Sequence, residues 1–357
     1  MLRFDWLNSL RSLMFNSTGK KKPFGKRRVE RAALIGRPLV VSQFVEALEW
    51  RELLATIDVV SNVLEIKDLG GNSDALTISC DTVNGWILIS DPSNPLLASV
   101  GSGSGSNSVT VPLSAFSGGI SVQTADGNDS LTINLSAGNF GRSITYQGGV
   151  GTDVLTVTGV GTFATVTHGL TNATDGTIDV TANSQISYSG LDSSAAVTDN
   201  LSATARVFTG NAVAETITVT DATNANMTIA STSGAAVTFA NPLSSLTINA
   251  GAANDTVTIT SLDTAYAGSL TINGDGDTDI VTLTPAISID SLSVDSETIN
   301  VNGGTITTSG AQSYTGSVHL GAATTIAGSA VSFTGTVDGG YALVVNASGA
   351  TLFSAAV

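Results

Sequence analysis

The chain has 357 residues, of which 42% are hydrophobic, 5% aromatic and 12% charged, and its formal net charge is −15. The remainder is rich in Gly, Ser, Thr and Asn, a composition typical of short strands and tight turns, which excludes a helical bundle or a coiled coil. Two His and a single Cys leave no material for a His/Cys metal site or a disulfide framework. We therefore expect an all-β protein.

Charge divides the chain near residue 55. Residues 1–52 hold eleven of the fourteen Lys and Arg and five of the 29 acids, whereas residues 53–357 hold three bases and 24 acids. The two parts therefore carry +6 and −21. An acidic body of this kind repels nucleic acid and attracts cations, so no nucleic-acid partner is expected. We assign residues 1–55 to a basic leader.

The leader contains an amphipathic start, a cluster of seven bases between Lys20 and Arg31, and a segment with helical spacing at 44–55. Residues 20–55 resemble the leader of large extracellular repeat proteins of planctomycete bacteria. Their E-x-L-E-x-R-x-L-L-A box is matched from Glu46 to Ala55. The resemblance implies export to the cell surface or the medium. The alternative is a solvated basic tail followed by one amphipathic helix. No run of eighteen apolar residues exists, so no membrane span is expected.

The body is repetitive. Residues 117–140 align with 141–164 at an offset of 24 without a gap, and residues 244–260 align with 268–284 at the same offset. Each unit holds two short runs in which apolar residues alternate with Thr or Ser, the pattern of half-buried strands. We therefore predict a parallel β-helix, or β-solenoid, with coils of about 20–24 residues. A series of small antiparallel sandwiches is the alternative.

The last part of the chain has a shorter repeat. Tyr314, Phe333 and Phe353 begin similar short stretches, at sequence offsets of 19 and then 20. This part resembles the repeats of filamentous-haemagglutinin-like and autotransporter-passenger proteins, which implies a right-handed β-helix on a cell surface. The chain stops inside a copy of the repeat, so self-association through the solenoid ends is expected.

These observations divide the chain into four segments. After the leader, residues 56–112 form an N-terminal β segment or cap, in which the Gly/Ser run at 101–106 is either part of the cap or a linker. Residues 113–299 form a solenoid with 24-residue repeats. Residues 300–357 form a solenoid with 19–20-residue repeats.

One motif suggests calcium binding. Residues 148–156, GGVGTDVLT, resemble the G-G-x-G-x-D-x-L-x nonapeptide of repeats-in-toxin β-rolls, which implies turn Asp residues that bind Ca²⁺. The motif recurs here at an offset of 24 rather than in tandem, so a continuous calcium ladder is excluded.

Stacking also predicts cation sites without that resemblance. Coils in register place Asp129 beside Asp153 and Asp255 beside Asp279, and two such carboxylates repel by roughly 1–3 kcal/mol. A bound Ca²⁺ would remove this cost, although Asp residues that only shape turns are the alternative. The candidate calcium ligands are Asp126, Asp129, Asp153, Asp255, Asp275, Asp277 and Asp279.

Catalytic signals are weak. His168 and His319 are far apart and accompany no Ser or Cys motif, Cys80 fits an inward core position, and three bases are few for a polysaccharide-binding enzyme. We therefore predict a non-enzymatic extracellular or cell-surface segment with a structural or adhesive role and a protein or glycan partner. The alternatives are a calcium-dependent binding module and a carbohydrate-active β-helix enzyme.

Overall fold

The computed structural model describes residues 55–357 except 69, 72 and 192–195. These residues belong to the second of two compact units, which spans residues 51–357. The predicted leader with its helix lies outside the described residues, apart from Ala55. The described residues form strands throughout, together with one short 3₁₀ turn, η1 (Leu113–Ala115). The all-β prediction is confirmed.

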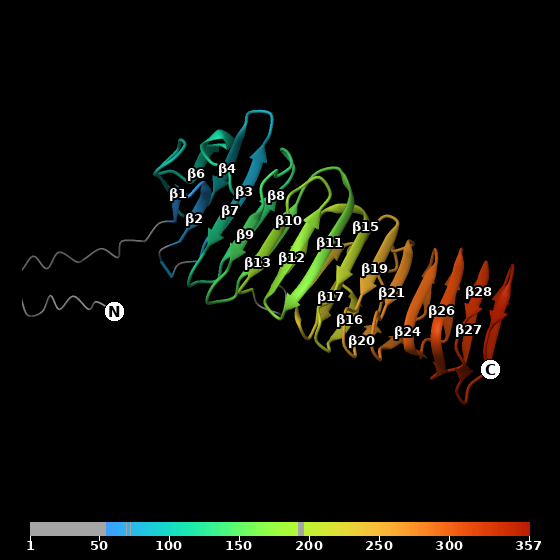
Figure 1. The fold of residues 1–357 in the computed structure, drawn as a ribbon. Helices are drawn as coiled ribbons and strands as arrows, with labels where there is room; N and C mark the ends of the chain where they lie inside the picture. Colours follow the sequence, from blue (N-terminus) through green and yellow to red (C-terminus); the bar gives the residue numbers. More distant parts are fainter. Residues whose placement is uncertain (1–54, 69, 72, 192–195) are drawn as a thin grey trace, which may run out of the picture. The chain divides into compact units, whose positions relative to one another are not determined.

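The strands form two long hydrogen-bonded ladders, in which successive coils lie side by side in chain order (Figure 1). The first ladder contains, in order of pairing, β6 (Ser108–Pro112), β4 (Trp86–Ser90), β3 (Ala75–Asp81), β8 (Ser130–Asn134), β10 (Val154–Thr158), β14 (Val197–Asp199), β18 (Gly234–Ala240), β17 (Asn226–Ser231), β16 (Thr216–Asp221), β20 (Thr256–Ile259) and β22 (Ile280–Leu283). It continues through the second halves of β24 (Leu292–Val301) and β26 (Ala311–Leu320) to β29 (Val337–Asp338).

The second ladder lies across the core from the first. It contains β1 (Thr56–Val60), β2 (Val63–Lys67), β7 (Ile120–Gln123), β9 (Ile144–Gln147), β13 (Ile186–Ser189), β12 (Asp175–Val180), β11 (Thr162–Asn172), β15 (Ser202–Thr209), β19 (Ser245–Asn249) and β21 (Ser269–Asn273). It continues through the first halves of β24 and β26 to β28 (Ala330–Phe333) and β31 (Thr351–Phe353).

A third, four-stranded sheet covers the last coils. It contains β23 (Ile287–Ile289), β25 (Thr305–Thr308), β27 (Thr324–Gly328) and β30 (Leu343–Ala347), all parallel. Because β24 and β26 each pair in both ladders, the two ladders are one continuous sheet that folds around the core. The C-terminal coils therefore have three faces, whereas the N-terminal coils have two.

The predicted registers are present. Leu131 pairs with Leu155 and Ile120 with Ile144, and Leu246 pairs with Leu270, all in parallel strands. Inward Leu, Ile and Val side chains are buried and alternate with outward Thr, Ser and Asn, as a half-buried strand requires. Stacked parallel coils with this regular offset are thus compatible with a β-solenoid.

Antiparallel hairpins interrupt this regularity, which the repeat alone did not predict. The first ladder turns back through β16, β17 and β18, and the second through β11, β12 and β13. These insertions lengthen the coil. Leu155 pairs with Val197 at a sequence offset of 42, and Val197 pairs with Val237 at an offset of 40. The offset shortens to 19 between Tyr314 and Phe333 and to 20 between Phe333 and Phe353.

Residues 56–112, which we call the cap, form mainly antiparallel pairs. β1 pairs with β2 in antiparallel orientation, and β5 (Leu97–Ala98) pairs with β1 in parallel orientation. The Gly/Ser run at 101–106 is part of this cap, since Ser102 exchanges two backbone hydrogen bonds of 2.9 Å with Thr110. Gly101 has φ +83°, and a Cβ there would lie 2.0 Å from the Thr110 oxygen, so only glycine fits.

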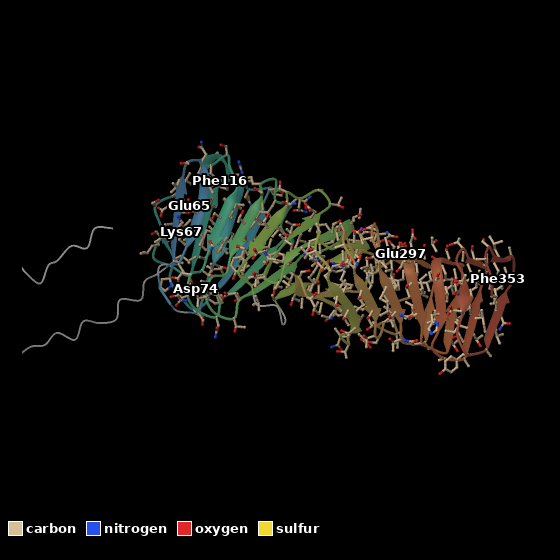
Figure 2. The ribbon with its side chains drawn as sticks, turned by 60° about the horizontal axis from the view of Figure 1, so that its bottom comes forward. Glu65, Lys67, Asp74, Phe116, Glu297 and Phe353 are labelled. Carbon is tan, nitrogen blue, oxygen red and sulfur yellow. The ribbon has the colours of Figure 1, made fainter. Side chains whose placement is uncertain are left out.

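The last coil is more open. Phe353 continues a stack of aromatic rings with Phe333 and Tyr314, whose neighbouring centroids are 5.0 Å apart. Leu352 and Phe353 are 53% and 38% exposed. Figure 2 shows Phe353 at this end.

Candidate functional site

Four of the seven predicted calcium ligands lie in two columns of carboxylates at the entry to the first ladder. Asp129 and Asp153 directly precede β8 and β10, and Asp255 and Asp279 directly precede β20 and β22. All four are at most 1% exposed. The predicted neighbours are in place, because the Asp129 backbone N–H donates to Asp153 Oδ1 at 2.9 Å and the Asp255 N–H to Asp279 Oδ1 at 2.8 Å.

Each column is longer than the sequence predicted. The Asp74 N–H donates to Asp129 Oδ1 at 2.7 Å. The Glu215 N–H donates to Asp255 Oδ1 at 2.7 Å, and the Asp279 N–H to Glu297 Oε2 at 2.8 Å. Figure 2 labels Asp74 in the N-terminal coils and Glu297 nearer the C-terminus.

These contacts explain why an acid occupies the corner. Inside a parallel strand, N–H groups donate alternately to carbonyls of the next and of the preceding coil, as Leu155 does to Ala196 and Val154 to Asp129, but at the corner the backbone turns away. The carboxylate of the next coil supplies the acceptor instead, so it extends the hydrogen-bond ladder by one residue. The first role of these four Asp residues is therefore to join coils.

The sequence repeats could have predicted two of the additional column residues, Asp74 and Glu215. The letters D-A-L-T-I from Asp74 match D-S-L-T-I from Asp129, and E-T-I-T-V from Glu215 match D-T-V-T-I from Asp255. Local alignment alone could have found both positions. Glu297 lies inside the long strand β24 and follows no such pattern.

The other three predicted ligands, Asp126, Asp275 and Asp277, lie on exposed turns. Asp275 and Asp277 have φ of +75° and +84°, the left-handed conformation that Asp tolerates in turns. Asp277 Oδ2 accepts the Ala253 N–H at 3.1 Å, so it too bridges two coils. Across the described part of the chain, no group of three or more His, Cys, Asp or Glu is arranged to hold a metal ion.

Burial changes the acidity of the columns. In the first, burial and the nearby carboxylates of Asp68, Asp91 and Asp129 raise the pKa of Asp74 to about 7. Burial raises the pKa of Asp129 to about 6. In the second column, burial raises the pKa of Asp255 and Asp279. The first column therefore favours a proton near neutral pH, and in the second column burial makes the ionised carboxylates less favourable than in water.

A buried ionic network that the sequence did not predict crosses the core. His168 on β11 and Arg206 on β15 come from the second ladder, and Asp199 on β14 comes from the first. All three side chains are fully buried. Asp199 Oδ2 contacts His168 Nε2 at 2.9 Å and also accepts from Arg206 Nη1, while Asp199 Oδ1 accepts the Leu201 N–H at 2.9 Å.

The buried charge of Asp199 is stabilised by Arg206 and His168. Burial alone would raise the pKa of Asp199, but the His168 hydrogen bond and the Arg206 charge together hold that pKa below its usual value. His168 stacks on Phe208, with centroids 4.9 Å apart, in an otherwise apolar ladder. The network thus ties the two faces together beside the inserted hairpins.

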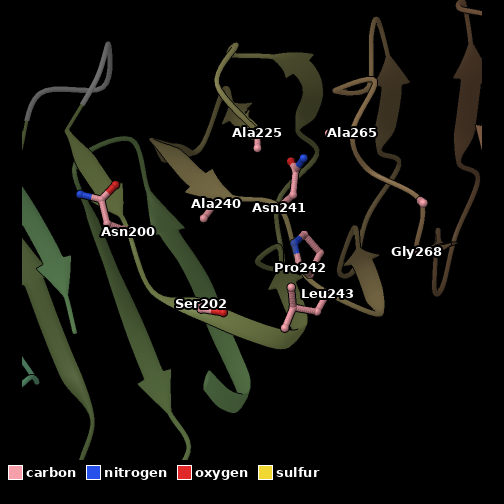
Figure 3. A pocket seen from close by; sticks show the side chains of 10 residues that line it. Asn200, Ser202, Ala225, Ala240, Asn241, Pro242, Leu243, Ala265 and Gly268 are labelled. Atoms are coloured by element: carbon pink, nitrogen blue, oxygen red, sulfur yellow. The ribbon is translucent and has the colours of Figure 1, made fainter. Parts of the chain in front are cut away.

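A pocket opens beside the network (Figure 3). Its volume is about 440 Å³. Its lining residues are Asn200, Ser202, Ala225, Ala240, Asn241, Pro242, Leu243, Ala265, Ala267 and Gly268. Arg206 donates from Nε to the carbonyl of the lining residue Ala240 at 2.9 Å. It also donates from Nη2 to the carbonyl of Leu201, which lies between the lining residues Asn200 and Ser202. The lining has amides and a hydroxyl but no acidic, basic or aromatic side chain.

No protein-family model matches the chain, and the searches of curated proteins and of solved structures also found no match. The residues described here include no helix that is long and apolar enough to cross a membrane.

We predict that Arg206→Met lowers the free energy of unfolding of the full chain by about 3–5 kcal/mol, because Asp199 stays buried with only His168 to balance its charge. Urea unfolding followed by circular dichroism measures the change. As a control, Lys67→Met breaks the surface pair with Glu65, and this change costs at most about 1 kcal/mol. Equal effects of the two substitutions would contradict a stabilising role for the network.

Stability should also depend on the Asp74 proton. A pKa raised to about 7 from the usual 3.8 means that the folded chain binds a proton that the unfolded chain releases between these pH values. This contribution to stability is complete below about pH 4 and is lost as the pH rises through 7.

We expect the wild-type melting temperature to fall by about 2 °C or more between pH 5 and pH 8 relative to that of Asp74→Asn, because only the wild type loses the proton on Asp74 over this range. Asp58→Asn removes one charge from the same cap and is the control. Parallel pH profiles for wild type and Asp74→Asn would show that the column does not retain a proton.

Proposed function

We propose that this chain is an exported, non-enzymatic solenoid segment with a structural or adhesive role at a cell surface or outside the cell. The observation that carries the proposal is that strand pairing runs without a break from β1 to β31, and that buried acids join one coil to the next. Such a stack is suited to spanning distance and resisting unfolding.

The outer surface supplies the contact area for a protein or glycan partner. Outward strand positions carry Thr, Ser and Asn, and the turns carry most of the acids. Export is supported by the resemblance of the leader around Glu46–Ala55.

Export can be tested with a reporter that is active only outside the cytoplasm. Alkaline phosphatase fused to the C-terminus of the full chain should be active in a diderm bacterium that secretes planctomycete-type proteins. A fusion with the seven leader bases replaced by Gln should lose most of this activity. An inactive wild-type fusion at normal abundance would contradict export, and release of sugar from polysaccharides by the purified chain would contradict a non-enzymatic role.

Calcium-dependent binding is a second candidate, favoured by one observation. Asp74, Asp129, Asp255 and Asp279 each keep a buried carboxylate oxygen, Oδ2, without a hydrogen-bond donor among the described residues. Within the same part of the chain, no Lys or Arg side chain is in an ion pair with them. A divalent ion with oxygen ligands would satisfy such atoms.

Thermal unfolding of the full chain in EDTA, in millimolar Ca²⁺ and in Mg²⁺ at matched ionic strength tests this candidate. A rise in melting temperature that is specific to Ca²⁺, and that Asp279→Asn reduces, would support it. Asp290→Asn, on the exposed surface, is the matched control. Equal responses to the two ions, or none, would leave charge screening as the only effect of cations.

A further inference from the structure

The cap contains the only Asp–Pro peptide bond of the chain, between Asp91 and Pro92. This bond directly follows β4, in the turn that leads to β5. An Asp–Pro bond is chemically weaker than other peptide bonds, for two reasons. The Asp carboxylate can attack its own carbonyl carbon through a five-membered ring. The Pro nitrogen carries no hydrogen, and as a tertiary amide it accepts a proton more readily than the nitrogen of an ordinary peptide.

The structure holds the Asp91 carboxylate over this bond. Asp91 is fully buried. Its Oδ1 accepts the N–H of Ser93 at 2.7 Å and the N–H of Asn94 at 3.1 Å, and its Oδ2 accepts the N–H of Ala75 at 3.4 Å. The contacts with Ser93 and Asn94 close a turn in which the side chain folds back across the Asp91–Pro92 peptide. The attacking group is therefore fixed beside its target, which removes most of the entropy cost of bringing the two together.

A side-chain donor points at the carbonyl oxygen of the same bond. Asn107, directly before β6, donates from Nδ2 to the Asp91 carbonyl oxygen at 2.8 Å. The Asn107 carbonyl in turn accepts the Asp91 N–H at 3.0 Å, so the donor is held in place. Attack on the carbonyl carbon places negative charge on this oxygen, and a fixed amide donor at this distance stabilises that charge.

Cleavage also requires a proton for the Pro92 nitrogen, and Asp74 is placed to supply it. Asn94 Nδ2 donates to Asp74 Oδ1 at 2.9 Å and to Asp91 Oδ2 at 3.4 Å, so the two carboxyl groups meet at one amide. Asp74 is 4% exposed, and its Oδ2 has no hydrogen-bond partner among the described residues. Burial and the neighbouring carboxylates raise the pKa of Asp74 to about 7. A carboxyl group that keeps its proton near neutral pH is a suitable general acid.

We propose that the chain cleaves its own backbone between Asp91 and Pro92. A carboxylate oxygen of Asp91 bonds to the Asp91 carbonyl carbon, and the Asn107 amide stabilises the oxyanion. The C–N bond then breaks as the Pro92 nitrogen takes the proton of Asp74 and leaves as a secondary amine. The products are a cyclic anhydride at Asp91 and a new N-terminus at Pro92. One water molecule, which can enter beside the exposed Pro92, opens the anhydride to two carboxyl groups, and a proton released in this step restores Asp74.

Cleavage separates residues 1–91, which include the basic leader, from residues 92–357. The two pieces stay together in the folded protein, because β3 pairs with β8 and β4 pairs with β6 across the broken bond. The break therefore appears only when the protein is unfolded, and the stack of coils keeps its length. This activity is independent of the structural or adhesive role, and it requires no metal ion and no partner protein.

The test is to incubate the purified full chain at about pH 6 with protease inhibitors, and then to follow denatured samples by intact-mass spectrometry. Wild type should give two pieces, one ending at Asp91 and one beginning at Pro92, at a rate that does not depend on protein concentration. The same chain kept unfolded in guanidinium chloride should stay intact, because the contacts around Asp91 are lost. Asn94–Pro95, in the same turn, is the internal control bond and should stay intact throughout.

Variants separate the roles of the residues. Asp91→Asn removes the attacking carboxylate, and Pro92→Ala, at an exposed position, removes the tertiary amide, so each should abolish cleavage. Asn107→Ala should slow cleavage by about 100-fold, the usual effect of losing one oxyanion donor. Asn84→Ala, on an exposed turn of the cap, is its matched control and should cleave at the wild-type rate.

The pH profile tests Asp74. The wild-type rate should fall as the pH rises through about 7, where Asp74 loses its proton, whereas Asp74→Asn should be slower and should lack this fall. Circular dichroism establishes that each variant is folded. An intact folded wild type, an equal rate in the unfolded chain, or cleavage of folded Pro92→Ala at the wild-type rate would overturn the proposal. Wild-type rates in both Asn107→Ala and Asp74→Asn would overturn the assisted mechanism.

Discussion

Strict register between neighbouring coils is the constraint on which the structure depends. Parallel pairing sets Leu76, Leu131, Leu155, Val197 and Val237 directly above one another, so each inward side chain packs on its counterpart. A slip of one residue would turn every one of these side chains to solvent. The same register aligns the carboxylates at the corners, so the carboxylate columns are a consequence of the same hydrogen-bond pattern.

The corners show how polar groups are accommodated within that pattern. A backbone N–H can donate to a carbonyl of the next coil only while the strand is extended. At the entry to the first ladder, the N–H donates to a carboxylate of the next coil instead. This solution stabilises the corner and also concentrates acids where few bases are available. The raised pKa of Asp74 reflects this cost. A bound proton or cation offsets it, which links coil stability to the solution around the protein.

The buried network of His168, Asp199 and Arg206 solves a different problem. Both ladders insert a hairpin in the same part of the chain, so the regular apolar packing of like on like is interrupted there. Asp199 contacts both His168 and Arg206, and Arg206 also donates to two backbone carbonyls, so these contacts specify one arrangement of the two faces. The pocket beside the network is bounded by the loops that Arg206 holds. Because Arg206 donates to the carbonyl of the lining residue Ala240, the network fixes the geometry of that wall.

The fold class and much of the strand register could be predicted from the sequence, because the alternation of apolar and polar residues and the constant offset between repeats are visible in the sequence itself. They predicted the all-β class, the registers of Ile120 with Ile144 and Leu246 with Leu270, and the neighbouring positions of Asp129 with Asp153 and Asp255 with Asp279. Only the tertiary structure revealed the inserted hairpins, because antiparallel and parallel strands share the same two-residue period. It alone showed that the column acids accept backbone N–H groups in the interior. It alone brought His168, Asp199 and Arg206 together, since their contact depends on two faces meeting across a core, and no spacing along the chain encodes that distance.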